Sequence, residues 1–225
     1  GAMLVVSFFA LVLSGFMLAY PDTWWARMLA EAGIGGWTRR YIHRTAAVVM
    51  IVASFVHLYW MLFTPYGRAE MKRIAPKMRD VREVMQNMRY HLGSSEQRAA
   101  FAKYDYPAKA EYWALIWGTV VMVLTGLGLW FERYLVMYVG KGVLEVFLII
   151  HYYEAWLAML AIIVWHIYFV IFNPDVYPMN LAWIKGTLTE EEMEEEHPLE
   201  LERIRAKRKE EGAQDDMIDV PVDED

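Results

Sequence analysis

The stretch 141–174 contains an apolar run that is long enough to cross a lipid bilayer, which takes about 20 residues of helix. Two histidines, His151 and His166, lie inside this run, and Glu154 is the only charged residue between them. An imidazole in hydrocarbon needs a polar partner. With a helical rise of about 1.5 Å per residue, the two rings lie roughly 22 Å apart and so near opposite faces of the membrane.

The chain contains four such windows, which predict membrane spans at about 3–20, 43–63, 112–131 and 147–172. Their apolar runs are unbroken, whereas the strands of a membrane barrel alternate. We therefore predict an all-α integral membrane four-helix bundle over 1–174 and an acidic cytoplasmic tail over 175–225. At least 16 of the 28 acidic residues follow Thr189, so the net charge of -6 gives no indication of a nucleic-acid partner.

The connection 65–110 carries ten Lys and Arg residues, against three in 21–42 and two in 132–142. The positive-inside rule places the long connection in the cytoplasm, which also makes both termini cytoplasmic. These features predict a multi-pass protein of the bacterial inner membrane. Within the connection, Ile74, Met78, Val81 and Met85 recur at helical intervals. They predict an amphipathic helix over 71–90 that lies on the membrane or under a partner.

The second span repeats the pattern of the fourth, with His43 and His57 about 21 Å apart along the helix. Alternate helices of an up-and-down bundle are parallel, so His43 pairs with His151, and His57 pairs with His166. Facing imidazoles are the axial ligands of a six-coordinate haem, and bundle cores hold such cofactors. Structural or proton-conducting histidines are the alternative. Around the axis of each regular helix, the second histidine would point about 40–60° away from the direction of the first. A bend or bulge in the helix is therefore expected to bring both toward the bundle core.

The absence of cysteine from the sequence excludes covalently attached c-type haem and cysteine-ligated clusters within it. Zinc and non-haem iron are disfavoured as the bound metal, because the membrane depth of each histidine pair offers two histidines and no carboxylate cluster. Two non-covalent haem b groups are thus expected. Arg39, Arg40 and Arg44 flank the His43 level and could neutralise haem propionates, although basic residues at a helix end are also common membrane anchors. The third span carries Gly118, Gly126 and Gly128 with Thr119 and Thr125. Its glycines allow close approach of a backbone or a cofactor, and helix packing is the commoner reason for such residues.

A quinone site needs polar groups beside an apolar slot. Glu111 and Tyr112 begin the third span and Asn173 ends the fourth, so they are the candidates at the level of His57 and His166. Glu154, near His151, is the competing candidate. The ligand would be menaquinone or ubiquinone.

Four segments resemble the membrane cytochrome b subunits of respiratory oxidoreductases, such as the gamma subunit of formate dehydrogenase. They are GWTRRYIHRTAAVVM, AEYWALIWGTVVMVLTGLGLWF, HYYEAWLAMLAIIVWHIYFVIFNPDVYP and KGTLTEEEMEEEHPLE. The resemblance implies a two-haem b subunit that anchors an electron-transfer module in the lipid and exchanges electrons with quinone. Its partners would be subunits such as multihaem cytochrome c or iron–sulfur proteins.

The family places a haem-ligating histidine at the start of the first helix, where this sequence has none. His166 therefore pairs with His57, which we favour, or with a residue upstream of Gly1. The function expected is electron transfer across the membrane between the quinone pool and partner redox subunits. The alternatives are a membrane anchor or scaffold that carries no current, and an ascorbate-type transmembrane reductase.

Overall fold

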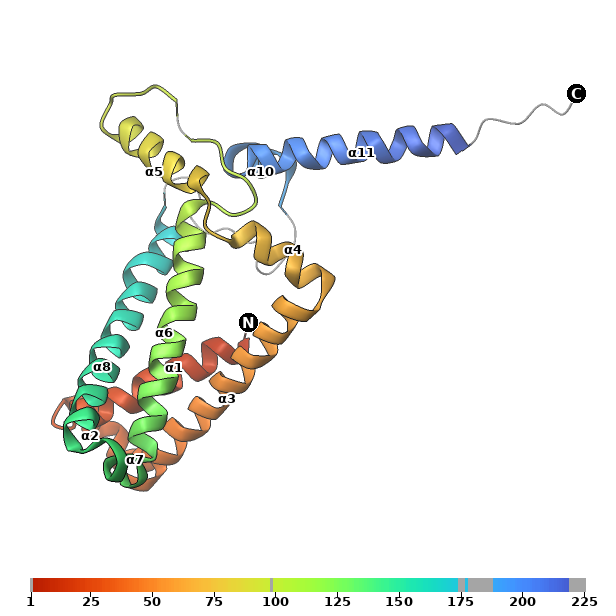
Figure 1. Cartoon of the computed structure of the whole chain (residues 1–225). Coiled ribbons are helices and arrows are strands. Elements are labelled where there is room, and N and C mark those ends of the chain that lie inside the picture. The colour runs from red at the N-terminus through yellow and green to blue at the C-terminus, as the bar shows by residue number, and fades with distance from the viewer. Residues whose placement is uncertain (1, 98, 174–176, 178–187, 219–225) are drawn as a thin grey trace, which may run out of the picture. The chain divides into compact units, whose positions relative to one another are not determined.

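The computed structural model describes residues 2–97, 99–173, 177 and 188–218, and this part of the chain contains helices and no strand. Four helical stretches are long and apolar enough to cross a membrane. These are α1 (Ala2–Ala19), α3 (Gly36–Phe63), α6 (Tyr106–Trp130) and the continuous stretch Lys141–Phe172. The predicted all-α membrane bundle with four spans is confirmed (Figure 1).

The remaining elements are short connections and the tail helices. They are α2 (Trp24–Leu29), η1 (Ala30–Ile34), α4 (Pro65–Ile74), α5 (Met78–His91), α7 (Glu132–Val139), α10 (Glu190–Glu196) and α11 (Pro198–Ile218). The fourth span comprises α8 (Lys141–Leu160), η2 (Ala161–His166) and η3 (Tyr168–Phe172), the last two with π-helical hydrogen bonding. A π-helix holds more residues per turn than an α-helix. The expected bulge between His151 and His166 is therefore present as η2.

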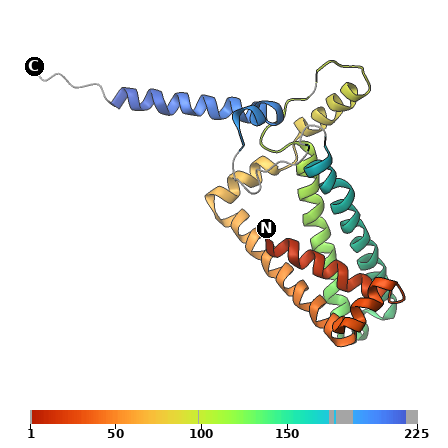
Figure 2. The same ribbon diagram turned by 180° about the vertical axis from the view of Figure 1, so that it is seen from behind.

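Two compact units make up the chain, and each is described separately. The first unit comprises 1–72 and 114–165, and the second comprises 73–113 and 166–225. In the first unit α1 lies against α3, as both ribbon views show (Figures 1 and 2). Ser7 Oγ lies 3.8 Å from Met50 Sδ across this contact, and Ala46 is buried there. Small side chains let spanning helices approach closely without a large apolar core.

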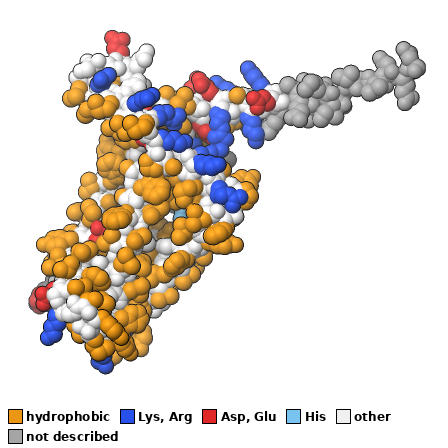
Figure 3. Space-filling view, viewed as in Figure 1, with side chains coloured by type: hydrophobic (Ala, Val, Ile, Leu, Met, Phe, Trp, Pro, Cys, Tyr) orange, Lys and Arg blue, Asp and Glu red, His pale blue; other side chains and the backbone are white. Residues whose placement is uncertain are grey.

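The outer surface of the first unit is apolar. Phe55 on α3 and Leu124 on α6 are 66% and 62% exposed, which would be costly in water over a surface this large. Hydrophobic side chains cover the visible face of these helices, while Lys and Arg gather on the α4 helix and in the second unit (Figure 3). An apolar exterior of this kind is solvated by lipid.

The amphipathic helix predicted over 71–90 is two helices, because Pro76 has no N–H to continue the first. In α5, the expected apolar face is exposed within the second unit, with Met78 at 75% and Val81 at 55%. The buried side chains of α5 are the polar Glu83 and Asn87. Asn87 Oδ1 accepts a hydrogen bond of 3.0 Å from the backbone N–H of Ala99. Asn87 thus anchors the loop that follows α5.

The tail helices pack within the second unit. The backbone N–H of Leu199 donates to the carbonyl of Phe101 at 3.2 Å, and Leu201 is buried. The His197 ring contacts the carbonyl of Ala102 at 2.9 Å through Nδ1. Of the tail predicted over 175–225, the structure describes residue 177 and residues 188–218. The start of α11 is therefore tied to the loop before α6.

Candidate functional site

His43 of α3 and His151 of α8 face each other inside the first unit. Their ring centroids are 6.5 Å apart and the ring planes differ by 63°. Two imidazoles that share one metal through bonds of about 2 Å have centroids roughly 6 Å apart, once half of each ring is added. The predicted pairing of these two histidines is present, with the spacing that an axial ligand pair needs. Among the described residues, no group of three or more metal-binding side chains comes together.

A hydroxyl group orients each of these two imidazoles. Ser14 Oγ of α1 lies 2.9 Å from His43 Nδ1, and Thr125 Oγ1 of α6 lies 2.9 Å from His151 Nδ1. Each hydroxyl donates its own hydrogen to a carbonyl one turn earlier, that of Ala10 at 2.5 Å and that of Val121 at 2.7 Å. The hydroxyl oxygens therefore accept from Nδ1–H, since their hydrogens are already used. This fixes the tautomer in which Nε2 carries a free lone pair, as a metal ligand must.

A glycine follows each hydroxyl residue and makes room for the imidazole. A Cβ added at Gly126 would lie 3.1 Å from His151 Cε1, and one added at Gly15 would lie 3.5 Å from His43 Cε1. The two halves of the site thus have the same construction, in which a hydroxyl residue and then a glycine hold one histidine. The donor set and its surroundings fit a bis-histidine haem.

The sequence signal that identifies these supporting residues is the pair of dipeptides Ser14-Gly15 and Thr125-Gly126. Gly126 was expected to allow close approach, and it does so at His151, whereas the hydrogen bond of Thr125 was not predicted. Ser14 and Gly15 were missed, because a lone Ser-Gly in an apolar helix is usually a packing site.

The three arginines proposed for the propionates lie close to this level. The Arg40 and Arg44 guanidinium carbons lie 4.7 Å from the ring centroids of Trp37 and Trp130, respectively. Arg39 Nη1 reaches the carbonyl of Ser14 at 3.5 Å, which is a long contact. Cation–π stacking on tryptophan holds the first two side chains near the helix ends. Their role toward a propionate stays a prediction.

The other two histidines belong to different units, and their pairing stays a prediction. His57 in the first unit is exposed, and its ring stacks on Trp60 of the same helix at 6.3 Å. His166 in the second unit is hydrogen-bonded through Nδ1 to a Glu111 carboxylate oxygen. A carboxylate on Nδ1 is the second-shell partner often found behind a metal-binding histidine. His166 is thereby oriented with Nε2 free.

The remaining quinone candidates lie as follows. Tyr112 packs edge-on against Trp113 with centroids 5.9 Å apart, and Asn173 caps the fourth span, its N–H bonded to the carbonyl of Tyr168. Glu154 is half-buried in the first unit and faces Gly118 of α6, where an added Cβ would lie 2.7 Å from Glu154 Oε1. Gly118 thus provides the space that the carboxyl group occupies.

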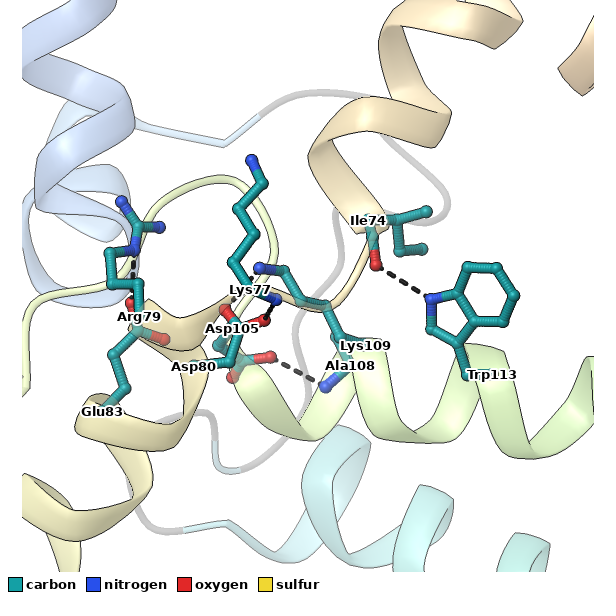
Figure 4. A network of polar contacts seen from close by, with 9 residues as sticks. All are labelled: Ile74, Lys77, Arg79, Asp80, Glu83, Asp105, Ala108, Lys109 and Trp113. Carbon is teal, nitrogen blue, oxygen red and sulfur yellow. Dashed lines mark hydrogen bonds and ion pairs between the residues drawn. The ribbon is translucent and has the colours of Figure 1, made fainter.

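A polar network in the second unit joins the starts of α5 and α6 (Figure 4). The ammonium of Lys109 lies 2.5 Å from Asp80 Oδ1, and the N–H of Lys77 donates to Asp80 Oδ2 at 2.7 Å. Lys109 and Asp80 side chains are 5% and 13% exposed, so this ion pair is shielded from water. Trp113 Nε1 donates to the carbonyl of Ile74 at 3.0 Å. The sequence pattern did not predict this pair, because Lys109 and Asp80 lie 29 residues apart in the chain.

Glu83 lies beside this network. Arg79 Nε is 2.8 Å from Glu83 Oε1, yet neither carboxylate oxygen has a hydrogen bond of good geometry within the described residues. Burial raises the pKa of Glu83 above its usual value, and the nearby Arg79 opposes the shift. Glu83 is thus an acid that holds its proton more firmly than one in water.

The comparisons with known proteins concern the family of the whole chain. Residues 2–181 match the sequence model of a family described as prokaryotic cytochrome b561. A similar protein is the formate dehydrogenase cytochrome b556 subunit of Haemophilus influenzae, which is 25% identical over 190 residues. The match covers 83% of this chain and 68% of that protein. The chain therefore belongs to the prokaryotic cytochrome b561 family and is a membrane b-type cytochrome of electron transfer.

Proposed function

We propose that this chain is a di-haem cytochrome b subunit that carries electrons across the membrane between the quinone pool and partner redox subunits. The observation that carries the proposal is the His43–His151 pair, with centroids 6.5 Å apart and both Nδ1 atoms bonded to hydroxyls. A haem bound there supplies a carrier for one electron at a time. The chain's own contribution is to hold the two imidazoles close together within an apolar bundle, with Nδ1 of each on a hydroxyl.

The second haem of the proposal uses His166, with His57 as the favoured partner or a histidine upstream of Gly1 as the alternative. The Glu111 hydrogen bond to Nδ1 supports His166, because it leaves Nε2 available. Extraction with acidic acetone is expected to release two haem groups per chain, since no cysteine can attach them covalently. A ratio of haem to protein chain near zero would favour the alternative of a membrane anchor that carries no current.

The partners of the proposal are the other subunits of a respiratory complex. The relative from Haemophilus influenzae is named as a subunit of formate dehydrogenase, which supports membership of such a complex. This sequence has no cysteine for a cluster of its own, so electrons would pass to or from a multihaem cytochrome c or an iron–sulfur protein. A purified chain that reduces or oxidises quinone without any partner would argue against this arrangement.

We place the quinone site at Glu111, Tyr112 and Asn173. The contact between Glu111 and His166 supports this assignment, because a carboxylate and an imidazole are suited to exchanging protons with a quinone that is being reduced or oxidised. Glu154 beside Gly118 remains the competing site.

Separate replacement of Glu111 by Gln, of Asn173 by Ala and of Glu154 by Gln tests the assignment. We expect Glu111→Gln to lower quinol oxidation at least about tenfold, a typical effect of losing a proton-transfer group, and Asn173→Ala to lower it about five-fold, the effect of losing one net hydrogen bond to the quinone. The haem spectra should stay intact, because the glutamine of Glu111→Gln keeps an acceptor oxygen for His166 Nδ1–H. Glu154→Gln is the matched control for the loss of one carboxylate, and activity should remain near the parent level. Loss of activity in Glu154→Gln alone would move the site to the His151 level.

The orientation proposed has both termini and the connection 65–110 in the cytoplasm, because that connection has ten basic residues. Trypsin added to right-side-out vesicles is therefore expected to leave Arg68–Lys109 intact, and trypsin added to inverted vesicles should cleave there. Fragments are read by mass spectrometry. Cleavage between Arg68 and Lys109 in right-side-out vesicles would reverse the orientation.

A further inference from the structure

The first unit contains an aromatic pocket that neither the haem ligands nor the quinone candidates occupy. Its volume is about 380 Å³, and its lining residues are Phe16, Tyr20, Thr23, Trp25, Trp156 and Met159. They come from the end of α1, the turn that follows it, the start of α2 and the C-terminal end of α8. Pockets for small organic ligands begin at roughly 300 Å³. The pocket is thus large enough for one or two fused rings.

The pocket walls are flat and apolar. The Phe16 and Trp156 rings lie 4.8 Å apart with planes tilted by 40°, and the Tyr20 ring meets Trp156 edge-on at 6.1 Å. The lining contains no acidic or basic side chain. Aromatic walls favour a planar ring, which stacks on a face or meets an edge. A flexible acyl chain gains no such geometric advantage.

A hydrogen-bond donor remains unused at the pocket wall. Trp156 Nε1–H donates to the Tyr20 hydroxyl at 3.1 Å, and the Tyr20 and Tyr152 hydroxyls are hydrogen-bonded to each other. These three groups have three hydrogens and make two contacts, so one O–H hydrogen is left over, and it belongs to Tyr20, which lines the pocket, when Tyr152 donates to Tyr20. Among the described residues neither hydroxyl has a further partner.

We infer that the aromatic pocket binds a flat, largely apolar ring that bears a carbonyl acceptor, which is the chemistry of a quinone head group. Tyr152 donates to the Tyr20 hydroxyl, the Tyr20 O–H donates to the carbonyl, and Phe16 and Trp156 contact the ring. This site is separate from Glu111 and Asn173, and it is also separate from Glu154, which faces α6. The inference concerns binding and does not depend on the proposed route of electrons.

A pair of ligands tests recognition of the carbonyl. Equilibrium dialysis of the full-length chain in detergent, with its haem bound, measures binding of menadione and of methylnaphthalene, which has the same rings without carbonyls. We expect menadione to bind at least about five-fold more tightly, the effect of one net hydrogen bond. Equal affinity of the two ligands would overturn the inference, because it would describe an apolar slot without carbonyl recognition.

A pair of variants locates the binding. Met159→Trp fills the pocket, and Met159→Leu keeps its volume nearly unchanged. Menadione binding should fall by one equivalent per chain in Met159→Trp and stay unchanged in Met159→Leu, with the haem spectrum of each variant as the check on folding. Unchanged binding in both variants would overturn the inference. So would a phospholipid found by native mass spectrometry to occupy the pocket, if menadione fails to bind after its removal.

The aromatic pocket and the quinone site at Glu111 can be tested separately, because one is measured by menadione binding and the other by quinol oxidation. Glu111→Gln is expected to lower quinol oxidation. It should nevertheless keep the one equivalent of bound menadione per chain that Met159→Trp loses. Loss of that equivalent in Glu111→Gln would mean that binding was never at the aromatic pocket.

Discussion

Replacing His151 with alanine is expected to remove the haem of the His43–His151 pair completely, because an iron left with one axial imidazole loses its six-coordinate low-spin state and half of its protein ligands. The absorption spectrum of the reduced protein and the haem content per chain measure the loss. His43→Ala should give the same result. A second haem, if His166 ligates it, should survive both changes.

Two matched variants sharpen this prediction. Thr125→Val keeps the shape of the side chain but removes the oxygen that lies 2.9 Å from His151 Nδ1, and loss of such a second-shell partner typically weakens metal binding about 10–100-fold. Thr119→Val on the same helix, where no hydrogen bond to a histidine is present among the described residues, is the control and should bind haem normally. An unchanged spectrum in His151→Ala would refute the assigned ligand pair.

Replacing Lys109 with methionine is expected to destabilise the second unit by about 3–5 kcal/mol, because it leaves the Asp80 carboxylate shielded from water without its cation. The effect is measured by urea unfolding of the detergent-solubilised chain, or as faster trypsin cleavage within 65–110. Adding Asp80→Asn should recover much of the loss, since no uncompensated charge then remains. Lys103→Met, an exposed lysine in the same unit, is the control. If Lys109→Met unfolds like the control, the ion pair contributes nothing measurable.

The sequence predicted the membrane architecture well, because the length of an apolar run is a direct physical requirement of crossing lipid. It also predicted the His43–His151 pair, since parallel helices place residues of equal depth side by side. It did not predict where α3 begins. Backbone hydrogen bonding extends that helix back to Gly36, through Trp37 to Arg40, although these residues are outside the apolar window.

The sequence could not predict contacts between distant segments. The bond from Leu199 to Phe101 joins backbone groups about a hundred residues apart, and nothing in either side chain encodes it. The same holds for α5, where periodicity identified an apolar face. The side chains of α5 that are buried within the second unit are the polar Glu83 and Asn87. The segments that contact this helix are polar there: the loop at Ala99 binds Asn87, and Lys109 binds Asp80. Periodicity identifies a face but not the surface that covers it.

The Nδ1 partners of the histidines differ in charge, and this difference affects electron density at Nε2. His43 and His151 each contact a neutral hydroxyl, while His166 contacts the Glu111 carboxylate. A carboxylate draws the Nδ1 proton toward itself and makes the imidazole a more electron-rich ligand. A more electron-rich ligand stabilises the oxidised form of an iron that it binds, which lowers the reduction potential. The chain thus gives His166 a charged Nδ1 partner and gives His43 and His151 neutral ones, so an iron held by His166 would have the lower reduction potential, other ligands being equal.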